Sequence, residues 1–344
     1  MNRFTRVGSA LLFLTFISIG GGVVRADPIA DFYANRLVTI VVGADTGGTY
    51  DLYARTIARH LGKYIPGSPK VIVETTPGAG GYNAAMRVLG VAPQDGTVIG
   101  ALGSSALPYQ PLLDPNAPKF EPLRINWLGS VAGYNVMMLV RSDVPVYSVD
   151  DLRKRETVMA TIAAGQLNSV IVAAVNAALG TKIKGIRGHI GMPPAMLAVE
   201  NGEVEGYPTA PIDALKRRHA KQIADGKLRL LLQFGPAPSK EFGDVPYALD
   251  LAATPADRSM LDVAQGPLGV GYAYMLGPGV PQDRAAVLRS AFEATLRDPE
   301  FLAEANKQVL SVAPISGQDI HARLVKAYDT PPAVLAPIRA AFGK

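Results

Sequence analysis

Two glycine-rich segments near the start of the chain have the composition of anion-binding turns. The first contains Thr46, Gly47, Gly48, Thr49 and Tyr50, and the second contains Gly78, Ala79 and Gly80. Each lies between an apolar run and a helical pattern. A glycine turn at a helix start leaves backbone N–H groups without an intrahelical acceptor, at the positive end of the helix dipole. Such turns hold anions without charged side chains, so the pair predicts a site for a small carboxylate.

The elements that must position these turns alternate between strand and helix. Apolar strand-like runs at 37–42 and 71–74 precede the two turns, and helical patterns at 52–61 and 82–89 follow them. Farther on, strand-like runs lie at 98–103, 136–140, 157–163 and 228–234, with helical patterns at 169–179, 193–201, 212–225 and beyond Pro281. This alternation predicts an α/β architecture with mixed, mostly parallel sheets.

Other polar residues are placed to complete the same site. Ligands of open α/β folds bind beyond the carboxyl ends of the strands, where Ser104 follows the run at 98–103. The middle of the chain offers further candidates for ligand contact, namely Gly165, Asn168, Ser169 and Thr209.

Each of these candidates also has a purely structural interpretation. The glycines could close tight turns, because glycine adopts dihedral angles that other residues avoid. Thr46 and Thr49 could cap the helix, and Asp51 is expected to cap it rather than to bind a ligand. Tyr50 could wall the site and offer its hydroxyl, or it could pack on the surface.

The N-terminal segment, residues 1–26, has the layout of a secretory signal peptide. Arg3 and Arg6 precede an apolar run, and Val24-Arg25-Ala26 fits a small-x-small cleavage site. An uncleaved anchor is the alternative. Removal of three arginines with this segment lowers the formal charge from +5 to +2. The sequence has no cysteine, so neither disulfides nor a cysteine-linked lipid can stabilise or anchor the protein.

The remaining chain is long enough for two domains. The residue pattern changes after two strand-like runs, which predicts a first domain of 27–138 with 236–344 and a second domain of 139–235. Lys216-Arg217-Arg218-His219 is the densest basic cluster, and we interpret it as the solvated face of a helix. No basic stripe interleaved with aromatics is present, so a nucleic-acid partner is not expected.

Enzymatic chemistry has weak support in the sequence. A dinucleotide fingerprint at 78–83 would need glycine where Asn83 stands. Gly103-Ser104-Ser105-Ala106-Leu107 lacks the closing glycine of a nucleophile elbow. The four histidines are scattered, and no pair has metal-ligand spacing. We therefore expect no catalytic residues, no cofactor and no metal, and we keep an exported α/β enzyme acting on a small acid as the alternative.

Three motifs resemble those of the extracytoplasmic substrate-binding proteins of the tripartite tricarboxylate transporters. That family has Pro-Phe-Ala-Pro-Gly-Gly-x-x-Asp, then Pro-Gly-Ala-Gly-Gly, then Pro-Asp-Gly-Tyr-Thr. The corresponding segments here are Gly43 to Asp51, Pro77 to Gly81 and Pro93 to Thr97. The turns at 243–246 and 276–281 stand where the family has Asp-Val-Pro and Pro-x-Gly-x-Pro turns.

The resemblance implies a two-domain periplasmic-binding-protein clamshell that holds an acidic ligand between its lobes. It further implies a monomer in the periplasm, with a small organic acid and the subunits of a membrane transporter as partners. The chain departs from the family pattern at Asp45, Thr46 and Tyr50, where the family usually has alanine, proline and threonine.

Overall fold

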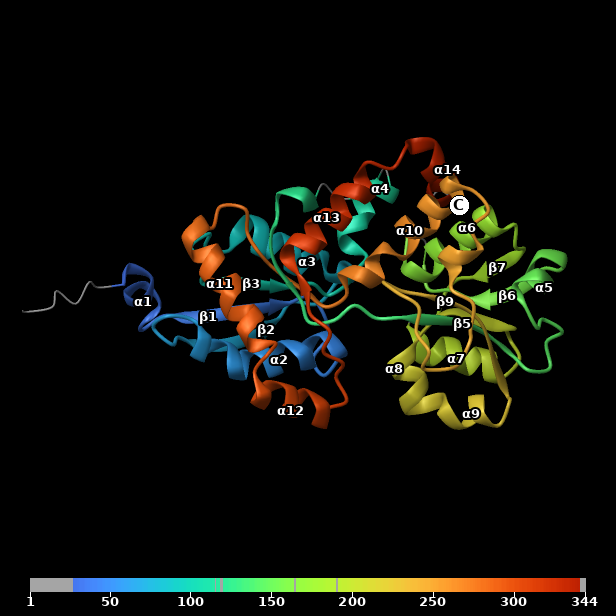
Figure 1. The fold of residues 1–344 in the computed structure, drawn as a ribbon, viewed down its shortest axis with the longest axis horizontal. Helices are drawn as coiled ribbons and strands as arrows, with labels where there is room; N and C mark the ends of the chain where they lie inside the picture. The colour runs from blue at the N-terminus through green and yellow to red at the C-terminus, as the bar shows by residue number, and fades with distance from the viewer. Residues whose placement is uncertain (1–26, 115, 118–119, 164, 190, 341–344) are drawn as a thin grey trace, which may run out of the picture.

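The computed structural model describes residues 27–114, 116–117, 120–163, 165–189 and 191–340. Two lobes lie side by side, each built on one β-sheet with helices on its faces (Figure 1). The predicted signal peptide lies outside the described residues. Within the described ranges, no helix combines the length and the apolar character needed to cross a bilayer.

The first lobe contains a six-stranded sheet in the order β11-β4-β10-β3-β1-β2. Its strands are β1 (Leu37–Val42), β2 (Lys70–Thr75), β3 (Val98–Ala101), β4 (Asn126–Ser130), β10 (Ala273–Leu276) and β11 (Ile315–Ser316). β1 pairs in parallel with β2 and β3, whereas β10 and β4 run antiparallel to their neighbours. The carboxyl ends of β2, β1 and β3 therefore meet at one edge.

The second lobe contains a five-stranded sheet in the order β7-β6-β8-β5-β9. Its strands are β5 (Val136–Arg141), β6 (Thr157–Ala160), β7 (Ile183–Ile186), β8 (Gly206–Pro211) and β9 (Leu228–Phe234). β6 is parallel to β7 and β8, and β5 is antiparallel to β8 and β9.

The two-lobed α/β clamshell is thus confirmed, with mixed sheets. The expectation that most pairs are parallel is too strong, because antiparallel pairs are as prominent as parallel ones. The antiparallel strands β4, β5, β9 and β10 flank the segments by which the chain passes from one lobe to the other. The segments that connect the lobes therefore do not follow the simple alternation of strand and helix.

The helices of the first lobe cover both faces of its sheet. They are α1 (Pro28–Tyr33), α2 (Thr49–Leu61), α3 (Tyr82–Met86), α4 (Gln110–Leu113), α11 (Gln282–Thr295), α12 (Pro299–Lys307) and α13 (Gly317–Tyr328). Those of the second lobe are α5 (Val149–Lys154), α6 (Leu167–Leu179), α7 (Met192–Glu200), α8 (Ile212–Ala214) and α9 (Ala220–Ala224).

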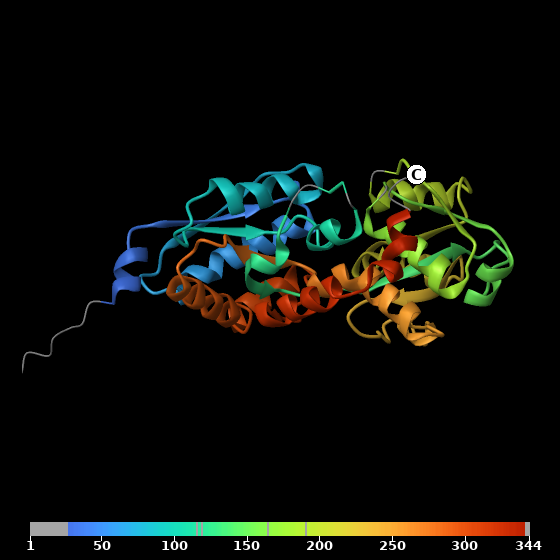
Figure 2. The same ribbon diagram turned by 90° about the horizontal axis from the view of Figure 1, so that it is seen from above.

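Two further helices, α10 (Pro255–Val270) and α14 (Pro332–Ala340), pack on α6. Figure 2 shows the C-terminal helices, in orange to red, running along one side of the molecule from the first lobe to the second. The division into 27–138 with 236–344 and 139–235 stays a prediction. β5 spans its first boundary, and α10 and α14 carry the C-terminal part of the chain onto the second lobe.

Helix α2 is the element that presents the first glycine turn, and its buried face fixes it to the sheet. Tyr53, Ala54, Ile57 and Leu61 are each at most 1% exposed, at the spacing of one helix face. They belong to the same apolar cluster as Val38, Ile40 and Val42 of β1.

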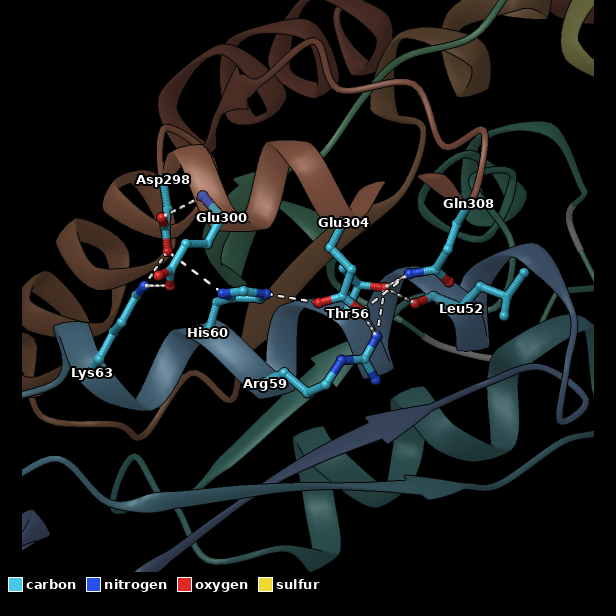
Figure 3. A network of polar contacts seen from close by, with 9 residues as sticks. All are labelled: Leu52, Thr56, Arg59, His60, Lys63, Asp298, Glu300, Glu304 and Gln308. Carbon is cyan, nitrogen blue, oxygen red and sulfur yellow. Dashed lines mark hydrogen bonds and ion pairs between the residues drawn. The ribbon is translucent and has the colours of Figure 1, made fainter. Parts of the chain in front are cut away.

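A polar network fixes α2 from its other side, against α12 (Figure 3). Asp298, 4% exposed, caps α12 by accepting from the Glu300 amide at 2.9 Å, and it pairs with Lys63 of the segment after α2. His60 lies 2.8 Å from Glu304 and 3.5 Å from Asp298. His60, Asp298 and Glu300 also form a group of metal-ligand type among the described residues, but the Lys63 ammonium already pairs with both of its carboxylates. We therefore assign the network a structural role.

Candidate ligand-binding site

Three loops converge where the parallel strands of the first lobe end. Loop one (43–48) follows β1, loop two (76–81) follows β2 and loop three (102–106) follows β3. Their glycines touch: a Cβ added to Gly103 would lie 1.8 Å from the Gly43 carbonyl oxygen, and one added to Gly81 would lie 3.0 Å from the Gly103 Cα. The backbones approach this closely only because no side chain intervenes.

Two backbone amides of loop one donate hydrogen bonds within the loop and the start of α2. The Gly47 N–H donates to Asp51 Oδ2 at 2.8 Å, and the Gly48 N–H donates to the Asp45 carbonyl at 3.1 Å. Asp51 also accepts from Arg55 at 2.9 Å, so its carboxylate holds the loop to α2; the N-cap residue Gly48 offers no side-chain cap. The amides of Gly47 and Gly48 are therefore not the free donors that the glycine pattern suggests. Thr49 and Tyr50, the first two residues of α2, have amides with no acceptor within the helix.

Loop two takes a backbone form that glycine favours. Gly78, Ala79, Gly80 and Gly81 all have positive φ angles. Gly80 is exposed, and a Cβ built on it would lie 3.9 Å from the side-chain nitrogen of Gln166 in the second lobe. Loop two thus faces the other lobe, while Thr46 and Thr75 bring their hydroxyl oxygens within 3.5 Å and link loops one and two.

Tyr50 reaches into loop three. Its hydroxyl accepts from the Ser105 amide at 3.1 Å, and the Ser105 hydroxyl lies 3.1 Å from that of Tyr134. Burial, and the neighbouring phenol of Tyr134, raise the pKa of Tyr50, so the hydroxyl stays neutral. Ser104, by contrast, accepts from the Ala106 amide at 3.3 Å. The phenol oxygen of Tyr50 therefore accepts the hydrogen bond of one backbone amide of loop three, that of Ser105.

The candidates of the second lobe brace one another. Asn168 Oδ1 accepts from the Ser169 amide at 2.8 Å, and the Ser169 hydroxyl donates to the Ala163 carbonyl at 2.8 Å. Thr209 is 6% exposed, and its hydroxyl and the Asn168 side chain both interact with the phenol of Tyr207. Gly165 lines a small hollow together with Ala106 of loop three, so it also faces the first lobe.

A cavity of about 420 Å³ lies between the lobes, beside the start of α2. Gly47, Thr49 and Tyr53 line it from the first lobe, and Tyr272 follows α10. The facing wall belongs to the second lobe and contains Asp213, Arg217 and Arg218, with Tyr134 from the segment that connects the lobes. Figure 1 shows α2 and α8 on the two lobes that this cavity separates.

The structure therefore brings the three first-lobe loops together and sets loops two and three opposite residues 165–166. Of the predicted site residues, Gly47 and Thr49 line the cavity of about 420 Å³. Sequence reasoning missed Tyr134, Tyr272, Arg217 and Arg218. Only the basic cluster gave a signal, and its pattern did not indicate which side of the helix meets another lobe.

Comparisons with known proteins support the same architecture. No family model matches the chain. It is 28% identical over 246 residues to a UPF0065 protein of Bordetella bronchiseptica, covering 70% of each chain. It is 27% identical over 257 residues to a UPF0065 protein of Cupriavidus necator, covering 73% of this chain and 75% of the relative.

Among solved structures, the chain is similar to a TctC solute-binding protein from Polaromonas, with a TM-score of 0.68 and 19% identity over 90% of this chain and 99% of that one. The periplasmic binding protein BugD has a TM-score of 0.60 and 20% identity, over 90% of this chain and 98% of BugD. MatC from Rhodopseudomonas palustris with bound malate has a TM-score of 0.59 and 18% identity, over 88% of this chain and 99% of MatC.

The predicted resemblance is confirmed, because the chain has the fold of the TctC and Bug solute-binding proteins. The Polaromonas protein is a solute-binding protein, and BugD is a periplasmic binding protein.

Proposed function

We propose that the chain is a periplasmic solute receptor that captures a small carboxylate-bearing ligand between its two lobes and delivers it to a membrane transporter of the tripartite tricarboxylate type. The observation that carries this proposal is the interlobe cavity at the start of α2, in a fold shared with solute-binding proteins. Solved structures of that fold include one with bound malate and one with adipate.

The chemistry of the first lobe suits an anion. The Thr49 and Tyr50 amides lie at the positive end of the α2 dipole, where a carboxylate is stabilised. The Thr49 hydroxyl is at the same end and lines the cavity. Contacts from the second lobe exist only when the lobes are together, so they favour a closed form that a transporter could distinguish from the open one.

A screen of carboxylates by thermal shift, followed by titration calorimetry on the hits, tests the receptor directly. Thr49→Asp is expected to weaken binding of any hit about a hundredfold, because the new carboxylate repels the ligand across a few ångströms. An acid at the first helical position suits the helix, so the variant should fold. Thr49→Asn adds no charge and is the matched control, expected within about threefold of the parent. A protein to which no carboxylate binds would contradict the proposal.

The role proposed for Gly78, Ala79 and Gly80 has its own test. Gly80→Asp places a negative charge on loop two, at a φ of 61° that aspartate tolerates better than most residues. We expect a loss of at least about tenfold in carboxylate affinity, again by like-charge repulsion. Gly226→Asp is the control, since Gly226 is also exposed, has a φ of 68° and has open space around it. Equal affinities of the two variants would remove loop two from the site.

A further inference from the structure

The interlobe cavity has a cationic wall that the basic cluster supplies. Residues Leu215–His219 form a π-helical turn, a form that often occurs at functional sites. Lys216 does not line the cavity, and it pairs at 2.8 Å with Glu241, which does. Arg217 and Arg218 line the cavity instead. Arg217 and Arg218 are exposed, as expected for a solvated helix face, and the structure adds that this face borders the interlobe cavity.

Both guanidinium groups are available to a ligand. Arg217 and Arg218 are exposed at the cavity, and neither forms a hydrogen bond or ion pair with another described residue. Of the acids of the same wall, Glu241 pairs with Lys216, whereas Asp213 accepts from the neutral Ser311 hydroxyl at 3.1 Å and keeps its charge. Two guanidinium groups therefore stand beside one uncompensated carboxylate. The net charge that faces the cavity is thus positive.

Tyrosine residues line the cavity from the first lobe and from the segment that connects the lobes. The ring of Tyr272 lies 4.4 Å from that of Tyr53 and 5.5 Å from that of Tyr134, centroid to centroid, and all three residues line the cavity. Burial, and Asp213 after it, raise the pKa of the Tyr53 phenol, and Arg217 lowers it. The phenols stay neutral. Tyr53 is 1% exposed, so the aromatic surface toward the cavity comes from Tyr134 and Tyr272, which are half-buried.

We propose that the cavity selects an aromatic carboxylate, with its ring against Tyr134 and Tyr272 and its carboxylate on Arg217. This inference rests on the proposed receptor function and names its ligand class. Arginine binds carboxylates through paired N–H donors, and stacked or edge-on rings gain energy beyond the apolar area they bury. The start of α2, on the facing lobe, adds positive potential at the same cavity.

Calorimetry with benzoate, cyclohexanecarboxylate and adipate tests the ring. Benzoate and cyclohexanecarboxylate carry the same charge on rings of similar size, so their difference reports the aromatic contribution. We expect benzoate to bind about tenfold more tightly than cyclohexanecarboxylate, as aromatic contacts of this kind imply. Equal affinity for the two, or a preference for adipate, would overturn the aromatic assignment while leaving a carboxylate receptor in place. Failure of all three acids to bind would overturn the aromatic assignment, and the receptor function would then be decided by the wider carboxylate screen.

Charge variants test the arginine. Arg217→Gln is expected to weaken benzoate binding about ten- to a hundredfold through loss of a charge-assisted contact. Lys221→Gln removes the same charge from the same lobe at a residue that pairs with Asp225 and does not line the cavity, and it should leave the affinity unchanged. Thermal melts establish that both variants are folded. Equal benzoate affinity in the two variants would overturn the assignment of Arg217.

Discussion

Gly103→Ala is expected to destabilise the protein by about 3 kcal/mol or more, which is a large effect for one methyl group. The added Cβ would lie 1.8 Å from the Gly43 oxygen and 2.8 Å from the Gly43 Cα. Both atoms are backbone at the end of β1, so no flexible side chain can yield. Loops one and three would have to separate, and the midpoint of urea unfolding should fall accordingly.

Gly90→Ala is the matched control. Gly90 is exposed, and no atom lies within 4 Å of an added Cβ there. It lies in the helical turn Arg87–Val91, where alanine is favoured over glycine by roughly 0.5–1 kcal/mol. The control should therefore be as stable as the parent or slightly more so. Similar unfolding midpoints for the two variants would show that the loops do not depend on backbone contact at Gly103.

The position of the loops could be predicted from sequence because its signals are local. An apolar run ends at a glycine turn, a helix follows, and parallel strands bring such turns to one edge. Which amides stay free could not be predicted in the same way. The Gly47 amide is taken by the Asp51 side chain, a local hydrogen bond that leaves no trace in periodicity. The backbone amides proposed to bind an anion are thus those of the first residues of α2, and not those of the glycines.

Helix α10 shows a different limit. Gly266 and Pro267 lie within its 16 residues, and both disfavour a helix interior. Gly266 is needed there because a Cβ would lie 2.5 Å from the Tyr109 hydroxyl, a contact between distant parts of the chain. A local signal for the start did exist, since Thr254 and Asp257 form a capping box. At the C-terminal end of α10, tertiary packing outweighs the low helix propensity of Gly266 and Pro267.

The cavity wall formed by Arg217 and Arg218 depends on how the lobes meet. A helical pattern shows which residues share a face, but it does not show what that face opposes. The same is true of Tyr272, whose ring contacts those of Tyr50 and Tyr53 in α2 and that of Tyr134 in the connection between the lobes, segments far apart in the sequence. Specificity residues contributed by the connection between lobes therefore lie beyond single-sequence reasoning.

Asp298→Ala is expected to cost about 2–4 kcal/mol of unfolding free energy. The variant loses the N-cap of α12 and leaves Lys63 and His60 without a buried partner (Figure 3). Glu300→Ala is the control: its side chain is 76% exposed and shares only the ion pair with Lys63, so its loss should cost below about 1 kcal/mol. Urea unfolding at neutral pH compares the two, and equal costs would show that the buried carboxylate does not stabilise the α2–α12 contact.

The same network makes a prediction about pH. Burial by itself would raise the pKa of Asp298, but Lys63, the Glu300 amide and His60 outweigh it and hold that pKa below its ordinary value of 3.8. A carboxyl whose pKa is lower in the folded state contributes stability above its unfolded pKa and loses that contribution as the pH falls through its folded pKa. The difference in stability between the parent and Asp298→Ala should therefore be constant near neutrality and shrink below about pH 4. A difference that stays constant down to about pH 2 would mean that the ionised carboxylate is not what joins α12 to α2, and that the N-cap hydrogen bond alone accounts for the effect.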